Sequence, residues 1–194
     1  MDPSTQKIID DLLAAAEEHD AAQADRLDRW RVLEPDAGRL LWFLALTLRA
    51  RNIVEIGTSR GVSTLWLADA ARSTGGHVLT LDVDAEAQNA ARASVHAAGF
   101  DDQVTFRRRD GGAALADLAD GSVDLLFLDA ERTEYPSWWP HPVRVLRTGG
   151  VLVVDNALSH PDEIEPVRLL LERDARLAVT TVAVGKGELL ALRR

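Results

Sequence analysis

Acidic residues and glycines recur in this sequence at the ends of short apolar runs. Glu55 and Gly57 close one such run, Asp82 closes the next, and Asp129 and Asp155 close two later ones. Carboxylates can accept hydrogen bonds from sugar hydroxyls or bind a hard cation, and glycine lets a backbone approach a ligand closely. If the runs are parallel strands, these residues share the edge of the sheet at which ligands bind. The pattern therefore predicts one site built from successive strand ends.

The loop from Gly57 to Gly61 has the spacing Gly-x-x-x-Gly and leads into a helix. The free N–H groups at a helix start favour a carboxylate or a phosphate. The spacing differs from the Gly-x-Gly-x-x-Gly of dinucleotide folds, which disfavours a pyrophosphate ligand and a nicotinamide dehydrogenase. The alternative interpretation is a tight strand-to-helix turn without a ligand.

Two further acids, Asp82 and Asp110, are expected to lie beside this loop. Asp82 is placed to accept both hydroxyls of a ribose, or to cap the next helix, a role that Asp84 can take instead. Asp110 and Gly111 can offer an acceptor and a backbone N–H to an adenine edge, or can form a turn only. Together with the loop, they describe a ligand with a nucleoside and a carboxylate but no pyrophosphate. S-adenosylmethionine meets this description.

The elements that position these residues alternate between strand and helix from residue 51 onward. Strands are expected at 53–56, 77–81, 104–107, 123–128 and 151–154, followed by a hairpin of 177–184 and 188–192. Helices are expected at 4–31 (with a second segment from residue 20 to residue 30), 38–48, 62–71, 85–98, 112–118, 142–146 and 162–173. Apolar strands that alternate with helices predict a mostly parallel sheet covered on both faces, a doubly wound Rossmann-like α/β fold in a single domain.

Four motifs occupy the strand ends: 54–58 with Gly61 and Ser63, 81–84, 127–130 with Tyr135, and Gly149-Gly150 leading to 154–156. In combination they resemble the catechol and caffeoyl-coenzyme A type of S-adenosylmethionine-dependent O-methyltransferases, from about Pro35 to the C-terminus. The resemblance implies a seven-stranded sheet whose last strand is antiparallel. It also implies an N-terminal helical lid (1–50) over a cofactor-binding core (51–194), and a homodimer.

The resemblance also assigns roles to residues. It implies cofactor contacts for Glu55, Gly57, Ser59, Gly61, Ser63, Asp82, Asp110, Gly111 and Asp129. It further implies a divalent cation, expected to be Mg²⁺, that is held by Asp129, Asp155 and Asn156. Three oxygen ligands suit such a hard ion, which would fix a substrate hydroxyl and ease its ionisation. The alternative is that Asp155 and Asn156 form a strand-to-loop turn and that Asp129 is a cap.

Two departures from the family pattern concern catalysis. Arg132 stands where the family typically has a lysine as general base, and an arginine stays protonated, so it can only orient an anionic substrate or stabilise a phenolate. The loop after Asn156 is short and lacks the glycine-rich insertion common there. His160 and His141 are the alternative bases because histidine titrates near neutrality, although either can be an exposed loop residue, as we expect for His141.

Trp138 and Trp139 follow this region. They can line a pocket for an aromatic substrate, although at least one is expected to pack in the core.

Composition limits the classes of partner. The 194 residues contain 46% apolar and 27% charged residues, no cysteine and a net charge of −9. Such an acidic chain disfavours a nucleic-acid partner. The absence of a long apolar run and of a basic, then apolar, N-terminus predicts a cytoplasmic protein without a membrane span.

The expected function is transfer of a methyl group to an oxygen of a small, catechol-like or other aromatic molecule. The alternatives are a metal-independent N- or O-methyltransferase and a non-catalytic protein that binds S-adenosylmethionine.

Overall fold

Seven strands form one sheet in the order β3-β2-β1-β4-β5-β7-β6. The structure is a computed structural model that describes residues 1–25 and 28–194. Strands β1 to β5 run parallel to one another, whereas β7 is antiparallel to both β5 and β6. This confirms the doubly wound fold with an antiparallel last strand. The strands are β1 Asn52–Ile56, β2 His77–Asp82, β3 Val104–Arg108, β4 Val123–Leu128, β5 Leu146–Val154, β6 Leu177–Val182 and β7 Glu188–Arg193.

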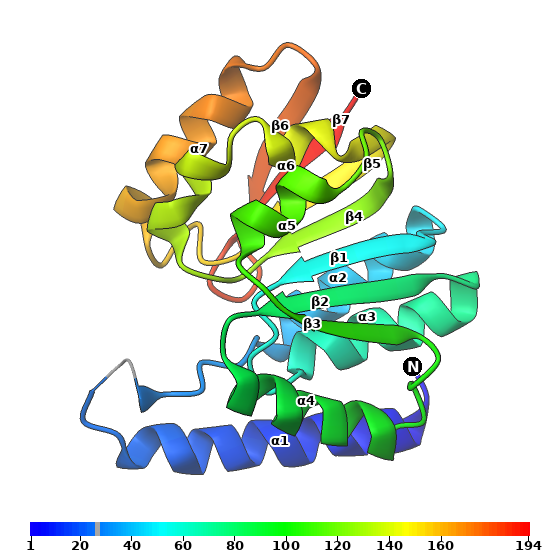
Figure 1. Cartoon of the computed structure of the whole chain (residues 1–194). Helices are drawn as coiled ribbons and strands as arrows, with labels where there is room; N and C mark the ends of the chain where they lie inside the picture. Colours follow the sequence, from blue (N-terminus) through cyan, green and yellow to red (C-terminus); the bar gives the residue numbers. More distant parts are fainter. Residues whose placement is uncertain (26–27) are drawn as a thin grey trace.

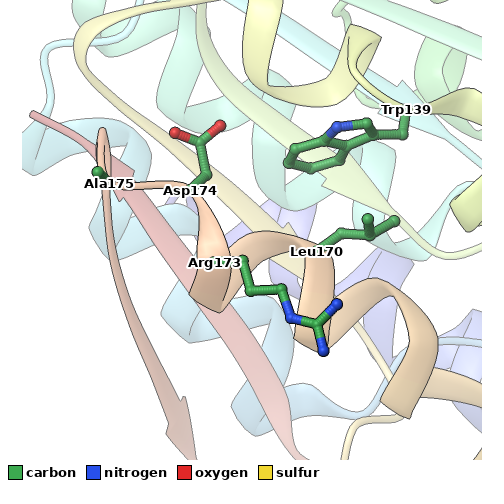
Figure 2. A pocket seen from close by; sticks show the side chains of 5 residues that line it. All are labelled: Trp139, Leu170, Arg173, Asp174 and Ala175. Carbon is green, nitrogen blue, oxygen red and sulfur yellow. The ribbon is translucent and has the colours of Figure 1, made fainter.

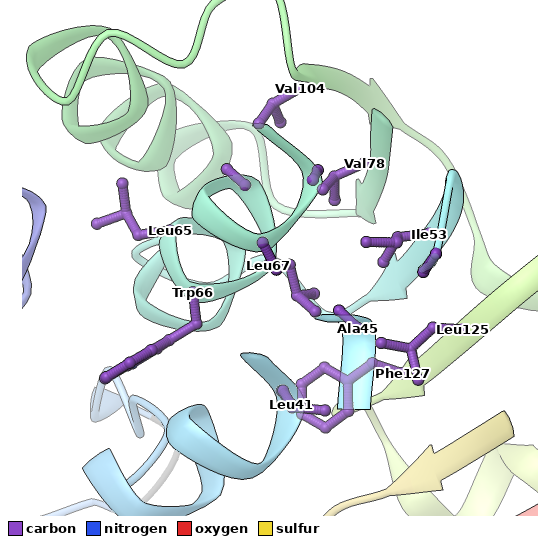
Figure 3. Packing of buried hydrophobic residues seen from close by; sticks show 14 of the residues in the cluster. Leu41, Ala45, Ile53, Leu65, Trp66, Leu67, Val78, Val104, Leu125 and Phe127 are labelled. Carbon is purple, nitrogen blue, oxygen red and sulfur yellow. The ribbon is translucent and has the colours of Figure 1, made fainter. Parts of the chain in front are cut away.

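Helices cover both faces of the sheet (Figure 1). Successive strand residues point to opposite faces, so Ile53 joins one hydrophobic cluster and Val54 the other. The first cluster, shown in Figure 3, includes residues of α1 to α4, and the second includes residues of α5 to α7. The helices are α1 Pro3–Ala22, α2 Pro35–Thr47, α3 Val62–Thr74, α4 Ala85–Ala97, α5 Gly111–Asp117, the 3₁₀ helix η2 Arg132–Trp138, α6 His141–Arg144 and α7 Pro161–Arg173.

The N-terminal helices share the core of the sheet domain. Leu41 and Ala45 of α2 are fully buried in the cluster that α3 completes. Gly38 lies against the indole of Trp66 so closely that a Cβ there would be 2.3 Å from its Nε1. Helices α1 and α2 are therefore packed on the sheet domain.

The helix expected from residue 20 to residue 30 is wrong beyond Ala22, where α1 ends. The Asp20 carboxylate accepts hydrogen bonds from the backbone N–H groups of Trp30 at 2.7 Å and Arg31 at 3.2 Å. An aspartate that binds distant backbone groups in this way competes with helix continuation and reverses the chain. Residues 26 and 27 of the expected helix lie outside the described ranges.

Other differences concern element boundaries. Strand β5 begins at Leu146, five residues before the expected start, with a register shift against β4 between Val123 and Leu125. The helix η2 was not expected. Within the ranges that the structure describes, no helix combines the length and the apolar character needed to cross a membrane.

Candidate active site at the carboxyl edge of the sheet

The strand ends form one continuous edge. Three hydrogen bonds extend the ladder past the strands: Gly57 N–H donates to Leu81 O at 2.8 Å, Asp129 N–H to Ile56 O at 2.9 Å, and Asp155 N–H to Leu128 O at 3.1 Å. The strand order therefore places Asp82, Gly57, Asp129 and Asp155 side by side along the edge. The sequence-predicted residues from four strands are brought together as expected.

Gly57 lies where the loop after β1 meets the chain that follows β4. Its φ of +103° lies in the left-handed region, and a Cβ there would stand 2.0 Å from the backbone oxygen of Asp129. Only glycine satisfies both the conformation and the contact. Gly61, with φ +87°, is the N-cap of α3, and a Cβ there would approach Ala91 Cβ at 2.9 Å.

Asp82 holds the loop between these glycines. Its Oδ2 accepts hydrogen bonds from the backbone N–H groups of Thr58 at 2.9 Å and Ser59 at 3.1 Å, and its Oδ1 accepts one from Asp84 N–H at 2.9 Å. Asp84 caps α4 through the N–H groups of residues 86 and 87, so the capping alternative for Asp82 is not realised. The carboxylate that is expected to bind a ribose therefore also fixes the loop.

Ser59 connects the loop to the N-terminal segment. It has a positive φ of 44°, a strained conformation for a residue with a side chain. Its hydroxyl donates to Trp30 O at 2.8 Å, and the guanidinium of Arg60 lies 4.4 Å from the centre of the Trp30 ring. The segment before α2 thus packs directly on the loop, a contact that the sequence did not indicate.

Glu55 lies beneath the loop with no exposed surface. Its Oε2 accepts hydrogen bonds from Thr64 at 2.5 Å and Thr80 at 2.6 Å, whereas Oε1 has no hydrogen-bond partner. Burial raises the pKa of Glu55 to about 7, although the hydroxyls of Ser63, Thr64 and Thr80 act in the opposite direction. An unpartnered buried carboxylate oxygen suits a cationic ligand group such as an ammonium.

Asp110 is the N-cap of α5 and accepts a hydrogen bond from Ala113 N–H at 2.8 Å. The turn interpretation is therefore realised for one of its oxygens. Gly111 and Gly112 are covered by the indole of Trp138, which a Cβ at Gly112 would approach to 2.5 Å. Trp138 itself is buried in the second hydrophobic cluster, as expected for at least one of the two tryptophans.

Asp129, Asp155 and Asn156 form the second half of the edge. Asn156 adopts a left-handed φ of +69°, which an asparagine tolerates better than most residues. Its Nδ2 donates to Asp155 Oδ2 at 2.7 Å and to Asp129 Oδ1 at 3.3 Å, so one atom contacts both carboxylates. Desolvation and the charge of Asp155 raise the pKa of Asp129 well above its ordinary value, and desolvation raises that of Asp155.

The donor chemistry of this triad fits a hard cation, because two crowded carboxylates and an amide offer oxygen ligands at one place. Within the described residues, no three or more His, Cys, Asp or Glu side chains are grouped as a ready metal site. The candidate therefore depends on the two aspartates together with the Asn156 amide, which can present its oxygen when the amide turns over.

Three charged residues beside this triad were missed as site residues. Glu188, the first residue of β7, is fully buried, and burial together with the charge of Asp155 raises its pKa to about 10. Lys186 Nζ pairs with Glu34 Oε1 at 2.6 Å, and Glu34 is the N-cap residue of α2. The signal was present in the sequence as the charged hairpin Gly185-Lys186-Gly187-Glu188, but only the fold shows that it reaches the acids.

Arg132 is buried and forms an ion pair with Glu163. Its Nε donates to Glu163 Oε2 at 2.7 Å, so the guanidinium ties η2 to α7. The nearby Tyr135 hydroxyl accepts a hydrogen bond from Ala130 N–H at 2.7 Å and thereby fixes the chain just after Asp129. The Glu163 carboxylate balances the positive charge of Arg132.

The two histidines differ in position. His160 Nδ1 lies 2.9 Å from Ser159 Oγ, which also donates to Asn156 Oδ1 at 3.2 Å, so a hydrogen-bonded chain connects His160 to the triad. His141 starts α6, and its Nδ1 accepts a hydrogen bond from Arg144 Nε at 3.2 Å. His141 therefore pairs within its own helix.

Two open hollows lie elsewhere on the described surface. Figure 2 shows one of about 390 Å³ that is lined by Trp139, Leu170, Arg173, Asp174 and Ala175. The other, of about 350 Å³, lies between α1 and α4. Neither is lined by a residue of the strand-end site, so Trp139 lines a hollow outside that site.

Comparison with known proteins gives consistent findings. The model of a family described as O-methyltransferase matches residues 10–194. A relative from Mycolicibacterium smegmatis, provisionally named an O-methyltransferase, is 36% identical over 198 residues, which are 95% of this chain and 91% of the relative.

Two solved structures are also similar to the chain. The O-methyltransferase from Bacillus cereus in complex with SAH superposes with a TM-score of 0.79 at 25% identity, covering 100% of this chain and 92% of the other. TomG from Streptomyces achromogenes, an O-methyltransferase of tomaymycin synthesis in complex with SAM, gives a TM-score of 0.76 at 27% identity, covering 100% and 90%.

Proposed function

The chain belongs to the O-methyltransferase family, and we propose that this S-adenosylmethionine-dependent enzyme methylates a hydroxyl of a small aromatic molecule with the help of a divalent cation. A catechol-like acceptor suits the site best, because a vicinal diol can chelate a cation with both oxygens. The family membership supports the cofactor and the reaction class. The cation and the acceptor are the finer part of the proposal.

One observation supports the proposed cation and acceptor. Asp129 and Asp155 follow neighbouring strands and share the Asn156 amide, and the backbone of Asp129 directly adjoins Gly57. A cation held by the triad and a cofactor held by the loop would therefore be neighbours. Their closeness suits a reaction between a bound hydroxyl and a sulfonium methyl group.

The residues divide the work as follows. Asp82 would accept the ribose hydroxyls, while Glu55 and Ser63 would face the methionine part and Asp110 with Gly111 the adenine. Asp129, Asp155 and Asn156 would hold Mg²⁺, which when bound supplies a fixed point for the acceptor and lowers the pKa of its hydroxyl. Arg132 would orient an anionic acceptor, for which its ion pair with Glu163 would have to open.

Methyl transfer forms one bond to carbon and breaks another. The acceptor oxygen forms a bond to the methyl carbon while the carbon–sulfur bond breaks, and S-adenosylhomocysteine is the second product. His160 would take the hydroxyl proton, since the Ser159 bridge ties it to the triad. The N-terminal helices would act as a lid, because the Trp30 segment lies on the cofactor loop. A homodimer and a cytoplasmic location stay predictions.

The test compares Asp155→Asn with Asp102→Asn, an exposed aspartate outside the site. We expect D155N to lose Mg²⁺-stimulated methyl transfer while its calorimetric affinity for S-adenosylhomocysteine stays within a few fold of wild type, and D102N to keep both. Undiminished transfer by D155N in the presence of a chelator would remove the cation and favour metal-independent methylation. Tight cofactor binding without transfer to any catechol, other phenol or amine would favour a non-catalytic binding protein.

A further inference from the structure

Glu188 is an acid whose position in the fold aims it at the candidate cation site. Strands β5 and β7 are antiparallel, and Val154 pairs with Leu189. The register therefore continues to Asp155 opposite Glu188. The backbone confirms how near the two segments are, because Ala157 N–H donates to Gly187 O at 2.8 Å.

Among the described residues, the Glu188 carboxyl group faces the carboxyl group of Asp155 but no hydrogen-bond donor from another residue. The side chain is fully buried. Burying a carboxylate without a hydrogen bond or a counter-charge is costly, so such a group needs a ligand or another role. The Lys186 ammonium, from the same hairpin, pairs with Glu34 instead.

We propose that Glu188 is a further carboxylate ligand of the divalent cation, beside Asp129, Asp155 and Asn156. The inference rests on the proposed function, because it presumes a cation at the triad. Four protein oxygens would leave two positions of an octahedral ion such as Mg²⁺. Two positions are what a vicinal diol fills, so a fourth protein ligand selects for acceptors that chelate.

The proposal requires the acidic side chains to turn toward one point, since no three or more His, Cys, Asp or Glu side chains are grouped as a metal site among the described residues. The rival role for Glu188 is a neutral carboxyl that donates a hydrogen bond to Asp155. Glutamine reproduces the shape and the donor of that neutral carboxyl but lacks the charge, so Glu188→Gln separates the two roles.

The experiment measures Mn²⁺ binding by electron paramagnetic resonance, in the presence of S-adenosylhomocysteine. The proteins are wild type, E188Q, D155N and Glu18→Gln, an exposed glutamate on α1 that serves as the matched control. We expect the Kd for Mn²⁺ to rise about 10- to 100-fold in E188Q, to stay within twofold in the control, and to be beyond measurement in D155N.

The outcomes separate the two proposals. Wild-type affinity in E188Q together with lost binding in D155N would overturn the role of Glu188 and leave the triad standing. No binding by wild type would overturn the cation in the proposed function and Glu188 with it. Should E188Q fail to fold, wild-type crystals soaked with Mn²⁺ decide: a Glu188 oxygen within about 2.3 Å of the anomalous peak supports the proposal, and a gap beyond about 3.5 Å overturns it.

Discussion

Replacing Gly57 by alanine tests whether the Gly57–Gly61 loop is in van der Waals contact with the chain just after β4. The added Cβ would stand 2.0 Å from Asp129 O and 2.6 Å from its carbonyl carbon, and both atoms belong to the backbone. The clash cannot be relieved by a rotamer change, so the loop must move away from Asp129. Gly75→Ala is the matched control, because Gly75 also has a positive φ, of +68°, but nothing lies within 4 Å of its Cβ position.

The difference between the two variants reports the contact. The positive φ costs alanine about 1–2 kcal/mol at residue 75 and at least as much at residue 57, whose φ of +103° lies outside the left-handed helical region, and overpacking adds about 1–3 kcal/mol at residue 57 alone. We expect urea unfolding to show G57A less stable than G75A by that added amount. Calorimetry should show an affinity for S-adenosylhomocysteine at least about tenfold lower in G57A, but unchanged in G75A. Equal stability of the two variants, with wild-type cofactor binding in G57A, would refute the contact between the loop and Asp129.

Three further predictions concern single side chains. Because burial raises the pKa of Glu55 to about 7 from 4.5, its protonated form stabilises the fold below pH 4.5, and this contribution is lost as the pH rises through 7. In wild type the free energy of unfolding should therefore fall by up to about 3 kcal/mol between pH 4.5 and pH 7, and Glu55→Gln should abolish this decline. Urea unfolding at several pH values measures it, and an unchanged decline in the variant would contradict the raised pKa of Glu55. Asp82→Asn removes the charge that the N–H groups of Thr58 and Ser59 share, so the calorimetric Kd for S-adenosylhomocysteine should rise about 10- to 100-fold, and an unaltered Kd would count against a ribose role. His160→Ala should lower kcat about 100-fold or more while the Kd for S-adenosylhomocysteine stays constant, and a wild-type kcat would exclude His160 as the base.

The sequence predicts the placement of the Gly57–Gly61 loop well because this part of the edge is built from local signals. A strand, a glycine turn and a helix start follow one another within the short stretch from Glu55 to Ser63, and the strand order then brings Asp82 and Asp129 beside it. The end of α1 was harder to predict, because Asp20 acts on backbone groups ten and eleven residues away.

Glu188, beside Asp155, also could not be predicted as a site residue, because its position depends on contacts between distant parts of the chain. Its closeness to Asp155 depends on the register of an antiparallel pair that is 33 residues apart in sequence. The apolar run 189–192 in β7 indicates a strand but does not say which of its residues faces which on the neighbouring strand. The same holds for Glu34 and Lys186, which meet only because the hairpin packs on the start of α2.

The most direct test of the whole account is methyl transfer from radiolabelled S-adenosylmethionine to a panel of catechols, by enzyme stripped with a chelator and then titrated with Mg²⁺. If the strand-end acids hold a cofactor and a cation side by side, label reaches the catechol oxygen only as Mg²⁺ is restored. Full transfer by the stripped enzyme, or no transfer at any Mg²⁺ concentration, would contradict the account.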